Sequence, residues 1–542
     1  MRPLIQEIQT AHTPESLVEQ LRGESGIVLL RSSSFDSPQA RYSFVAANPF
    51  LIFRSSGSRC EVTHHSPLAT RHIQFGNPWH ILDALMARFE LLDEIDLPFP
   101  LGGCFGYWGY DLKNFTEPKL PRRAVNDLEL PDCHVGFYDS LVVFDHRLGK
   151  VCIVSTGLNA DGSRSEARAQ EQAGFWQTLL SDDSGRTLTT ALSLSERARE
   201  NRSQVSGEAK RGEISEAQKK FDELAAILPR PRRGGEGRGE GAVSSNLTRA
   251  GFLAAVERAQ CYIRAGDIYQ VNLSQRLTAR WGETPSRPNQ FSKSAGWKMF
   301  EKLSAVSPAP FSAFLDCGEF EIASSSPEQF LRMSGSHIVT RPIKGTRPRD
   351  ADPTRDAQLA YELQTSAKEL AELVMITDLL RNDLGKVCEY GSVQVPDLAK
   401  LEKFAQVQHL VSTVEGRLRK DVTHFAAFAS CFPGGSITGA PKFRAIEIID
   451  ELEPISRGPY CGAIGYLGFN RESQLNIAIR TAICRDGLAH FNVGAGIVAD
   501  SNPEAEYEET LAKARGFFAA LEVAERRMEI SPAQRPGSVV PK

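Results

Sequence analysis

A long polar segment divides this chain of 542 residues and limits what the chain can fold into. Residues 181–245 are rich in Ser, Arg, Glu and Gly and end in PRPRRGGEGRGEGAVSS. Such a composition cannot bury enough apolar surface to offset the entropy lost on ordering. We therefore expect a flexible linker, with a short helix at most from Ser215 to Leu228, where Ser215 and Gln218 have the spacing of a capping box. The expected organisation is an N-terminal region (1–160), this linker, a second folded region (246–525) and a C-terminal tail (526–542).

The pattern of apolar residues in the second region predicts a mixed fold. Thr248 is placed to cap a helix that runs to about Ala265. Further helices are expected at Ser366–Asn382 and Pro503–Leu521. Strands and helices alternate without a repeating strand-helix-strand unit, which favours an α+β fold over a doubly wound parallel sheet.

Composition excludes several classes of protein. A net charge of −4 argues against nucleic acid as the main partner. No apolar run is long enough to span a membrane, and the first residues, MRPLIQEIQTAHTP, lack the apolar core of a signal peptide. The ten cysteines form no Cys-x-x-Cys pattern. Reduced thiols are typical of intracellular proteins, so we expect a cytoplasmic protein.

Lys344 stands in an unusual setting for a lysine. Two prolines and a glycine restrict the backbone around it, whereas a lysine that only aids solubility needs no such setting. Two Glu-x-x-Glu pairs follow on expected helices, Glu369 with Glu372 and Glu506 with Glu509. Either pair alone is more typical of a solvated helix face. If all four converged, their repulsion would favour a hard cation with oxygen ligands, and Mg²⁺ is the usual choice.

Groups able to hold an anion lie in the same region. Arg480 is the lone charge in an expected strand, Asn476–Ile483, and would pair well with a substrate carboxylate. Gly494–Gly496 is expected to form a tight turn after a strand at Leu488–Val493, where backbone N–H groups could bind an anion or merely close the turn. Ser436 and Thr438 precede an expected helix, and capping alone would also explain Thr438. A nucleophilic amine, four carboxylates and anion-binding groups together indicate an enzyme for a small, anionic, metal-bound substrate.

Five ordered motifs resemble those of the chorismate-utilising enzymes, which include anthranilate synthase component I, aminodeoxychorismate synthase component I, and the isochorismate and salicylate synthases. The resemblance covers residues 246–521 and is weaker over 1–160. It implies an α+β fold like that of anthranilate synthase component I, with large antiparallel sheets packed in the core, helices outside and the active site in a cleft. The motifs are PIKGTRPR, AELVMITDLLRNDLGKV, HLVSTVEG, GGSITGAPKFRAIEIIDELEP and GAGIVADSNPEAEYEETLAKA.

Two positions resemble one branch of the family. Anthranilate synthases carry alanine where this chain has Lys344, and the branch that makes 4-amino-4-deoxychorismate carries lysine. Water-using members carry a lysine base where this chain has Gln270. The resemblance therefore implies amination of chorismate at C4, a step toward 4-aminobenzoate and folate. The alternatives are anthranilate synthesis and a regulatory protein that binds chorismate without turning it over.

The resemblance also implies roles for individual residues. Lys344 would attack ring C2, Glu328 would protonate the leaving 4-hydroxyl, and His409 would be a further active-site residue. Mg²⁺ on the four glutamates would hold the ring carboxylate. The remaining substrate-binding positions are Gln270, Thr346, Ser436, Thr438, Tyr466, Arg480, Gly494, Ala495, Gly496 and Lys513. Some members of the family have a tryptophan pocket, and six residues of this chain resemble it: Ser32, Arg41, Tyr42, Pro310, Phe311 and Ser312. Gln39 and Ala40 depart from the pattern of that pocket.

The chain lacks a recognisable glutaminase site. Such a site needs a cysteine in a tight Gly-x-Cys-x-Gly turn followed by a histidine. Cys104 lies in a similar glycine-rich stretch, but it precedes an aromatic strand and no suitable histidine and glutamate follow. We therefore expect free ammonia as a substrate, or glutamine with a separate glutamine amidotransferase subunit in a heterodimer.

Overall fold

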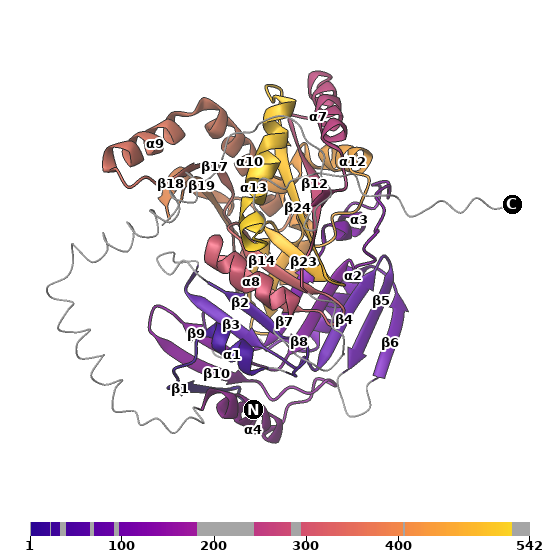
Figure 1. Cartoon of the computed structure of the whole chain (residues 1–542). Coiled ribbons are helices and arrows are strands. Elements are labelled where there is room, and N and C mark those ends of the chain that lie inside the picture. Colours follow the sequence, from indigo (N-terminus) through magenta and orange to yellow (C-terminus); the bar gives the residue numbers. More distant parts are fainter. Residues whose placement is uncertain are drawn as a thin grey trace.

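The computed structural model describes residues 2–21, 23–32, 40–64, 70–91, 97–181, 243–282, 294–404 and 407–522, and Figure 1 shows their arrangement. Most of the expected linker, including Ser215–Leu228, and the tail from 526 lie outside these residues. The described strands form two 12-stranded sheets in which the ladders are antiparallel. The predicted α+β class with large antiparallel sheets is confirmed.

The first sheet follows the order β1-β10-β9-β3-β2-β13-β14-β23-β24-β12-β11, with β20 also paired to β12. Its strands are β1 (Leu4–Ile8), β2 (Val28–Arg31), β3 (Tyr42–Ala46), β9 (Ser140–Asp145), β10 (Lys150–Ser155), β11 (Ser244–Ser245), β12 (Gln270–Arg280), β13 (Phe311–Asp316), β14 (Glu321–Ser326), β20 (Gly439–Ala440), β23 (Thr481–Arg485) and β24 (Leu488–Ile497).

The second sheet follows the order β17-β19-β16-β15-β22-β21-β7-β8-β4-β5-β6, with β18 also paired to β19. Its strands are β4 (Leu51–Ser56), β5 (Arg59–His64), β6 (Thr70–Phe75), β7 (Gly103–Trp108), β8 (Cys133–Tyr138), β15 (Gln329–Ser334), β16 (His337–Thr340), β17 (Ile343–Pro348), β18 (Gln394–Lys403), β19 (Val407–Arg417), β21 (Ala463–Gly468) and β22 (Glu472–Ile477).

Both sheets run through the two halves of the sequence. In the first sheet β2 pairs with β13, and in the second β7 pairs with β21. Aromatic side chains fill the space between them: the Tyr466 ring lies 5.2 Å from that of Phe44 and 5.4 Å from that of Phe105. The N-terminal strands therefore complete the sheets that carry the C-terminal motifs.

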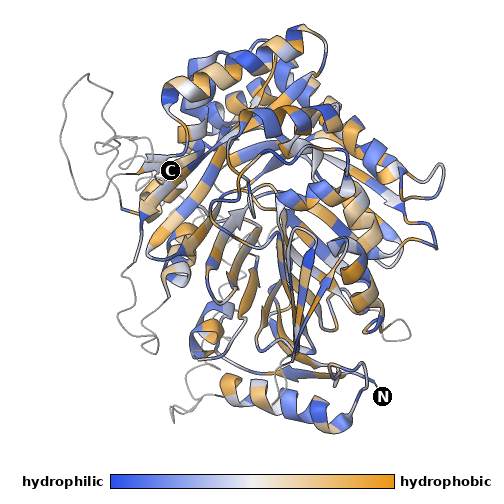
Figure 2. Ribbon diagram, turned by 90° about the vertical axis from the view of Figure 1, so that its right-hand side faces the viewer, coloured by the Kyte–Doolittle hydropathy of each residue, from blue (hydrophilic) through white to orange (hydrophobic). Residues whose placement is uncertain are grey.

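Helices cover the sheets, and their polar residues face outward while apolar residues face the strands (Figure 2). Thr248 caps α7 as predicted, and Ser366 caps α10; each hydroxyl accepts a hydrogen bond from an N–H in the first turn. In the described residues, no helix combines the length and apolar character needed to cross a bilayer. The helices are α1 (Pro14–Gln20), α2 (Pro78–Ala87), α3 (Lys113–Thr116), α4 (Glu166–Leu180), α7 (Arg249–Arg264), α8 (Ala295–Val306), α9 (Pro353–Thr365), α10 (Ala367–Gly385), α11 (His424–Cys431), α12 (Lys442–Leu452) and α13 (Pro503–Ala520).

Two local predictions were wrong. Arg480 does not lie within a strand, because β22 ends at Ile477 and β23 begins at Thr481; its backbone takes a left-handed φ of 51° in the connection. Gly494–Gly496 is not a turn, because β24 continues through it to Ile497. Close packing explains glycine within a strand here, since a Cβ on Gly494 would lie 2.8 Å from Asn272 Oδ1.

Candidate active site

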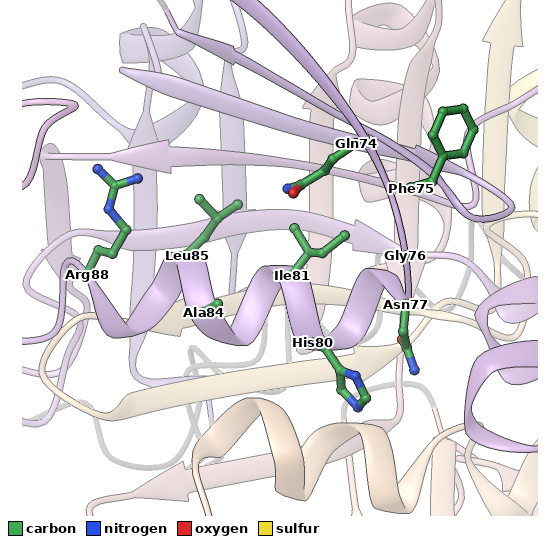
Figure 3. Close-up of a pocket in the computed structure, with 9 residues that line it drawn as sticks. All are labelled: Gln74, Phe75, Gly76, Asn77, His80, Ile81, Ala84, Leu85 and Arg88. Atoms are coloured by element: carbon green, nitrogen blue, oxygen red, sulfur yellow. The ribbon is translucent and has the colours of Figure 1, made fainter.

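A cavity of about 1040 Å³ lies where strands of both sheets meet α10 and α13. Its wall includes β12 and β24 from the first sheet and β17 and β19 from the second. A smaller hollow of about 390 Å³ lies between β6 and α2, shown in Figure 3, and none of its lining residues is acidic. The large cavity is therefore the one that contains the predicted lysine and glutamates.

Lys344 enters the cavity from a distorted strand. The ladder between β17 and β19 shifts register between Lys344 and Thr346, because Gly345 bulges with a φ of 71°. Burial lowers the pKa of the Lys344 amine, while the charges of Glu372 and Glu328 oppose that shift. A depressed pKa increases the fraction of neutral amine, which is the nucleophilic form.

Glu328 follows the end of β14 and faces the same cavity. Burial raises the pKa of its carboxyl, although a hydrogen bond from Ser436 and the charge of Lys344 act in the opposite direction. A buried carboxyl that holds its proton can act as a general acid. The charges of Glu328 and Lys344 thus each shift the pKa of the other group.

His409 contributes a neutral ring to the cavity wall. Its Nδ1 lies 2.9 Å from the Thr346 hydroxyl. Burial and the nearby positive charge of Arg480 lower the pKa of His409 to about 4. At neutral pH the ring therefore acts as a hydrogen-bonding group without charge.

All four glutamates of the Glu-x-x-Glu pairs line this cavity. Burial raises the pKa of Glu372 and of Glu506, and Glu509 adds to the shift of both. Glu369 pairs with Arg347, and Glu509 pairs with Lys513. In the part of the chain that the structure describes, no three acidic, histidine or cysteine side chains stand together as a preassembled metal site. All four side chains offer carboxylate oxygens, which are the ligands that a hard cation prefers, so their chemistry fits Mg²⁺.

One wall of the cavity carries two cationic side chains, Arg480 and Lys513. Arg480 lines it, and burial lowers the pKa of this guanidinium. Among the described residues no carboxylate lies within ion-pair distance of it, so a carboxylate of a ligand would supply the missing partner. Lys513 lies nearby and donates a hydrogen bond to the Gly494 carbonyl at 2.9 Å.

Several predicted positions differ from expectation. Tyr466 was assigned to the substrate site, but it lies in the aromatic core and away from the large cavity, whose wall contains Tyr460 instead. Thr438 is fully buried and donates to the carbonyls of Gly434 and Gly435, which supports the loop and leaves Ser436 as its cavity-lining hydroxyl. The alternation of β24 turns Ala495 away from the cavity that Gly494 and Gly496 line.

Gln270 was predicted to bind substrate but does not line the cavity, and two lining residues were missed. Gln270 lies behind the wall, where a Cβ on Gly496 would come within 2.5 Å of its Nε2. Asn272 and Lys368 line the cavity and were missed. Asn272 carried a usable signal, because it stands two residues after Gln270 on the same face of an expected strand.

Five of the six residues assigned to a tryptophan pocket line one small hollow of about 30 Å³, roughly the room of one water molecule. Arg41 does not line it and instead forms an ion pair with Asp145. Tyr466 closes the hollow on the side of β21. The five residues that line it are Ser32, Tyr42, Pro310, Phe311 and Ser312.

Comparison with known proteins identifies the family. The model of the chorismate binding enzyme family matches residues 34–519, and the chain belongs to that family. It is 36% identical to anthranilate synthase component 1 of Acetivibrio thermocellus over 94% of this chain and 93% of the relative. It is also 36% identical to aminodeoxychorismate synthase component 1 of Salmonella typhimurium over 91% of this chain and 93% of the relative.

Solved structures agree with the fold. Anthranilate synthase component I from Streptococcus pneumoniae superposes with a TM-score of 0.65 at 27% identity, over 88% of this chain and 92% of that chain. The menaquinone-specific isochorismate synthase of Escherichia coli superposes with a TM-score of 0.64 at 16% identity, over 96% and 94% of the two chains. Overall identity does not separate the two activities, so the distinction depends on residues in the cavity.

Proposed function

We propose that this chorismate-binding enzyme replaces the ring 4-hydroxyl of chorismate with an amino group and releases 4-amino-4-deoxychorismate. The observation that carries the proposal is Lys344, a half-buried lysine whose amine has a lowered pKa and which shares the cavity with Glu328, whose carboxyl has a raised pKa. The two opposite pKa shifts favour the pair of forms that this chemistry needs, a free amine and a protonated acid.

The reaction proceeds in two displacements. The neutral amine of Lys344 forms a bond to ring C2 while Glu328 gives its proton to the departing 4-hydroxyl, which leaves as water. Ammonia then bonds to C4, and the electrons of the C2–nitrogen bond return to Lys344 as a free amine. The new C4 ammonium returns a proton to the Glu328 carboxylate, so chorismate and ammonia yield aminated product and water with the enzyme restored.

Binding of the substrate uses charges on two sides of the cavity. Glu369, Glu372, Glu506 and Glu509 would hold Mg²⁺, which when bound supplies positive charge for the ring carboxylate. Arg480 and Lys513 would hold the enolpyruvyl carboxylate. With both carboxylates fixed, ring C2 is oriented toward Lys344.

Anthranilate formation is the competing candidate, because relatives of that name are equally similar. The two functions differ in the product: anthranilate is aromatic and fluorescent, whereas 4-amino-4-deoxychorismate retains the enolpyruvyl ether. The test is purified chain with chorismate, ammonium and Mg²⁺, with the products separated by chromatography. The aminated, non-aromatic product is expected, and anthranilate as the main product would refute the proposal.

A further inference from the structure

Two side-chain amides on β12 carry buried oxygens with no hydrogen-bond partner. They are Gln270 Oε1 and Asn272 Oδ1. The residues are two apart on one strand, so their side chains share a face. Both lie over the glycines of β24, since a Cβ on Gly496 or Gly494 would collide with Gln270 Nε2 or Asn272 Oδ1. A buried acceptor without a partner costs about 1–3 kcal/mol, which a ligand that donates hydrogen bonds would recover.

Asn272 alone of this pair lines the large cavity. Its backbone is fixed at both ends: its N–H donates to the Thr438 carbonyl at 2.8 Å, and its carbonyl accepts from Arg457 Nη2 at 2.8 Å. Arg457 is itself held by a buried ion pair with Glu453. The backbone that carries the Asn272 side chain is therefore held in place beside the cavity.

Ammonia suits such a site better than most ligands. It carries three N–H donors and one lone pair, so acceptor oxygens can bind its hydrogens while the lone pair stays free to attack carbon. An amide oxygen accepts hydrogen bonds but is too weak a base to take a proton from water. It would thus hold ammonia, which is nucleophilic as it stands, without generating hydroxide from competing water.

We propose that Asn272 Oδ1 binds the attacking ammonia in the second displacement, an inference that rests on the proposed amination. The ammonia nitrogen donates one hydrogen bond to this oxygen and directs its lone pair at ring C4. As the C4–nitrogen bond forms, the C2–nitrogen bond to Lys344 breaks, and the proton released by the new ammonium passes to the Glu328 carboxylate. Asn272 exchanges no proton in this step.

The test is steady-state kinetics of Asn272→Leu, which keeps the side-chain shape and removes the acceptor, with ammonium and chorismate varied separately. The KM for ammonium is expected to rise about ten-fold, and the KM for chorismate to stay within about two-fold. Asn114→Leu is the matched control, because Asn114 Oδ1 is another buried acceptor without a partner, on α3 and outside the cavity wall. That variant should leave both KM values unchanged.

Asn272→Asp provides the second variant, since a carboxyl keeps the acceptor oxygen and should keep the ammonium KM within about three-fold. An unchanged ammonium KM in Asn272→Leu, or an equal rise in both KM values, would overturn the assignment of Asn272 while the amination itself stood. If wild-type enzyme gave no aminated product from ammonium, the proposed function would fail instead. The two failures are thereby distinguishable.

Discussion

Replacing Arg480 with leucine should stabilise the fold and at the same time abolish useful binding of chorismate. Arg480 is a half-buried guanidinium on the cavity wall, and the described residues offer it no carboxylate partner. It also keeps a left-handed φ of 51° on a residue other than glycine. A charge without a partner and a strained backbone both oppose folding. Such a cost to stability is expected where a residue serves to bind a ligand.

The magnitude follows from two opposing effects. Removing a half-buried charge that has no partner should raise the free energy of unfolding by about 1 kcal/mol. Losing two charge-assisted hydrogen bonds to a substrate carboxylate should cost about 3–5 kcal/mol of binding, or roughly a 150-fold or larger rise in the KM for chorismate. Leucine and arginine have the same backbone strain at this φ, so the strain does not contribute to the difference in stability between the variant and the native protein.

Chemical unfolding followed by tryptophan fluorescence, together with chorismate kinetics, measures both effects. Arg457→Leu is the contrasting control, because that arginine is only 3% exposed and pairs with Glu453 at 2.7 Å. Breaking this pair leaves a buried carboxylate alone and should destabilise the fold by about 3–5 kcal/mol. If Arg480→Leu destabilised the protein as Arg457→Leu does, Arg480 would have a structural partner and the reasoning would be wrong.

Three further outcomes are expected. Excess chelator should stop turnover reversibly, and Glu372→Gln or Glu509→Gln should raise the Mg²⁺ requirement about ten-fold or more; activity indifferent to chelator would exclude the metal. Burial lowers the pKa of His424 to about 4, below the ordinary value near 6.5. Between these two pH values the unfolded chain therefore binds more protons at this residue than the folded chain does. The free energy of unfolding should therefore fall by about 2 kcal/mol from this residue between pH 6.5 and 5, and His424→Gln should flatten the slope measured by urea unfolding at each pH. Purified chain should aminate chorismate with ammonium at high pH and fail with glutamine until a glutaminase subunit is added; product from glutamine alone would reveal a glutaminase site in this chain.

Local sequence signals predicted the helices of the site well. Ser366 and Asn502 cap α10 and α13, and each cap fixes the helical phase that points a Glu-x-x-Glu pair into the cavity. The α+β class followed from the same alternation of elements. These features depend on residues a few positions apart, which the sequence shows directly.

Features that depend on distant contacts could not be predicted in the same way. The glycines of Gly494–Gly496 predicted a turn, because the sequence does not show that Gly494 packs against Asn272 on β12, far away in sequence. Tyr466 and Tyr460 differ little in local context, and only the packing of Phe44 and Phe105 places Tyr466 in the core. The sequence also gave no sign that the N-terminal strands would complete both sheets.

The most direct test of the covalent mechanism is the mass of the enzyme quenched with acid during turnover. With chorismate and Mg²⁺ present and ammonium limiting, an adduct derived from chorismate is expected on the peptide that contains Lys344. It should disappear when ammonium is added in excess and should be absent from Lys344→Ala, which is expected to lose formation of 4-amino-4-deoxychorismate while remaining folded. Wild-type rates of that product in Lys344→Ala, with no adduct on the native enzyme, would contradict the account.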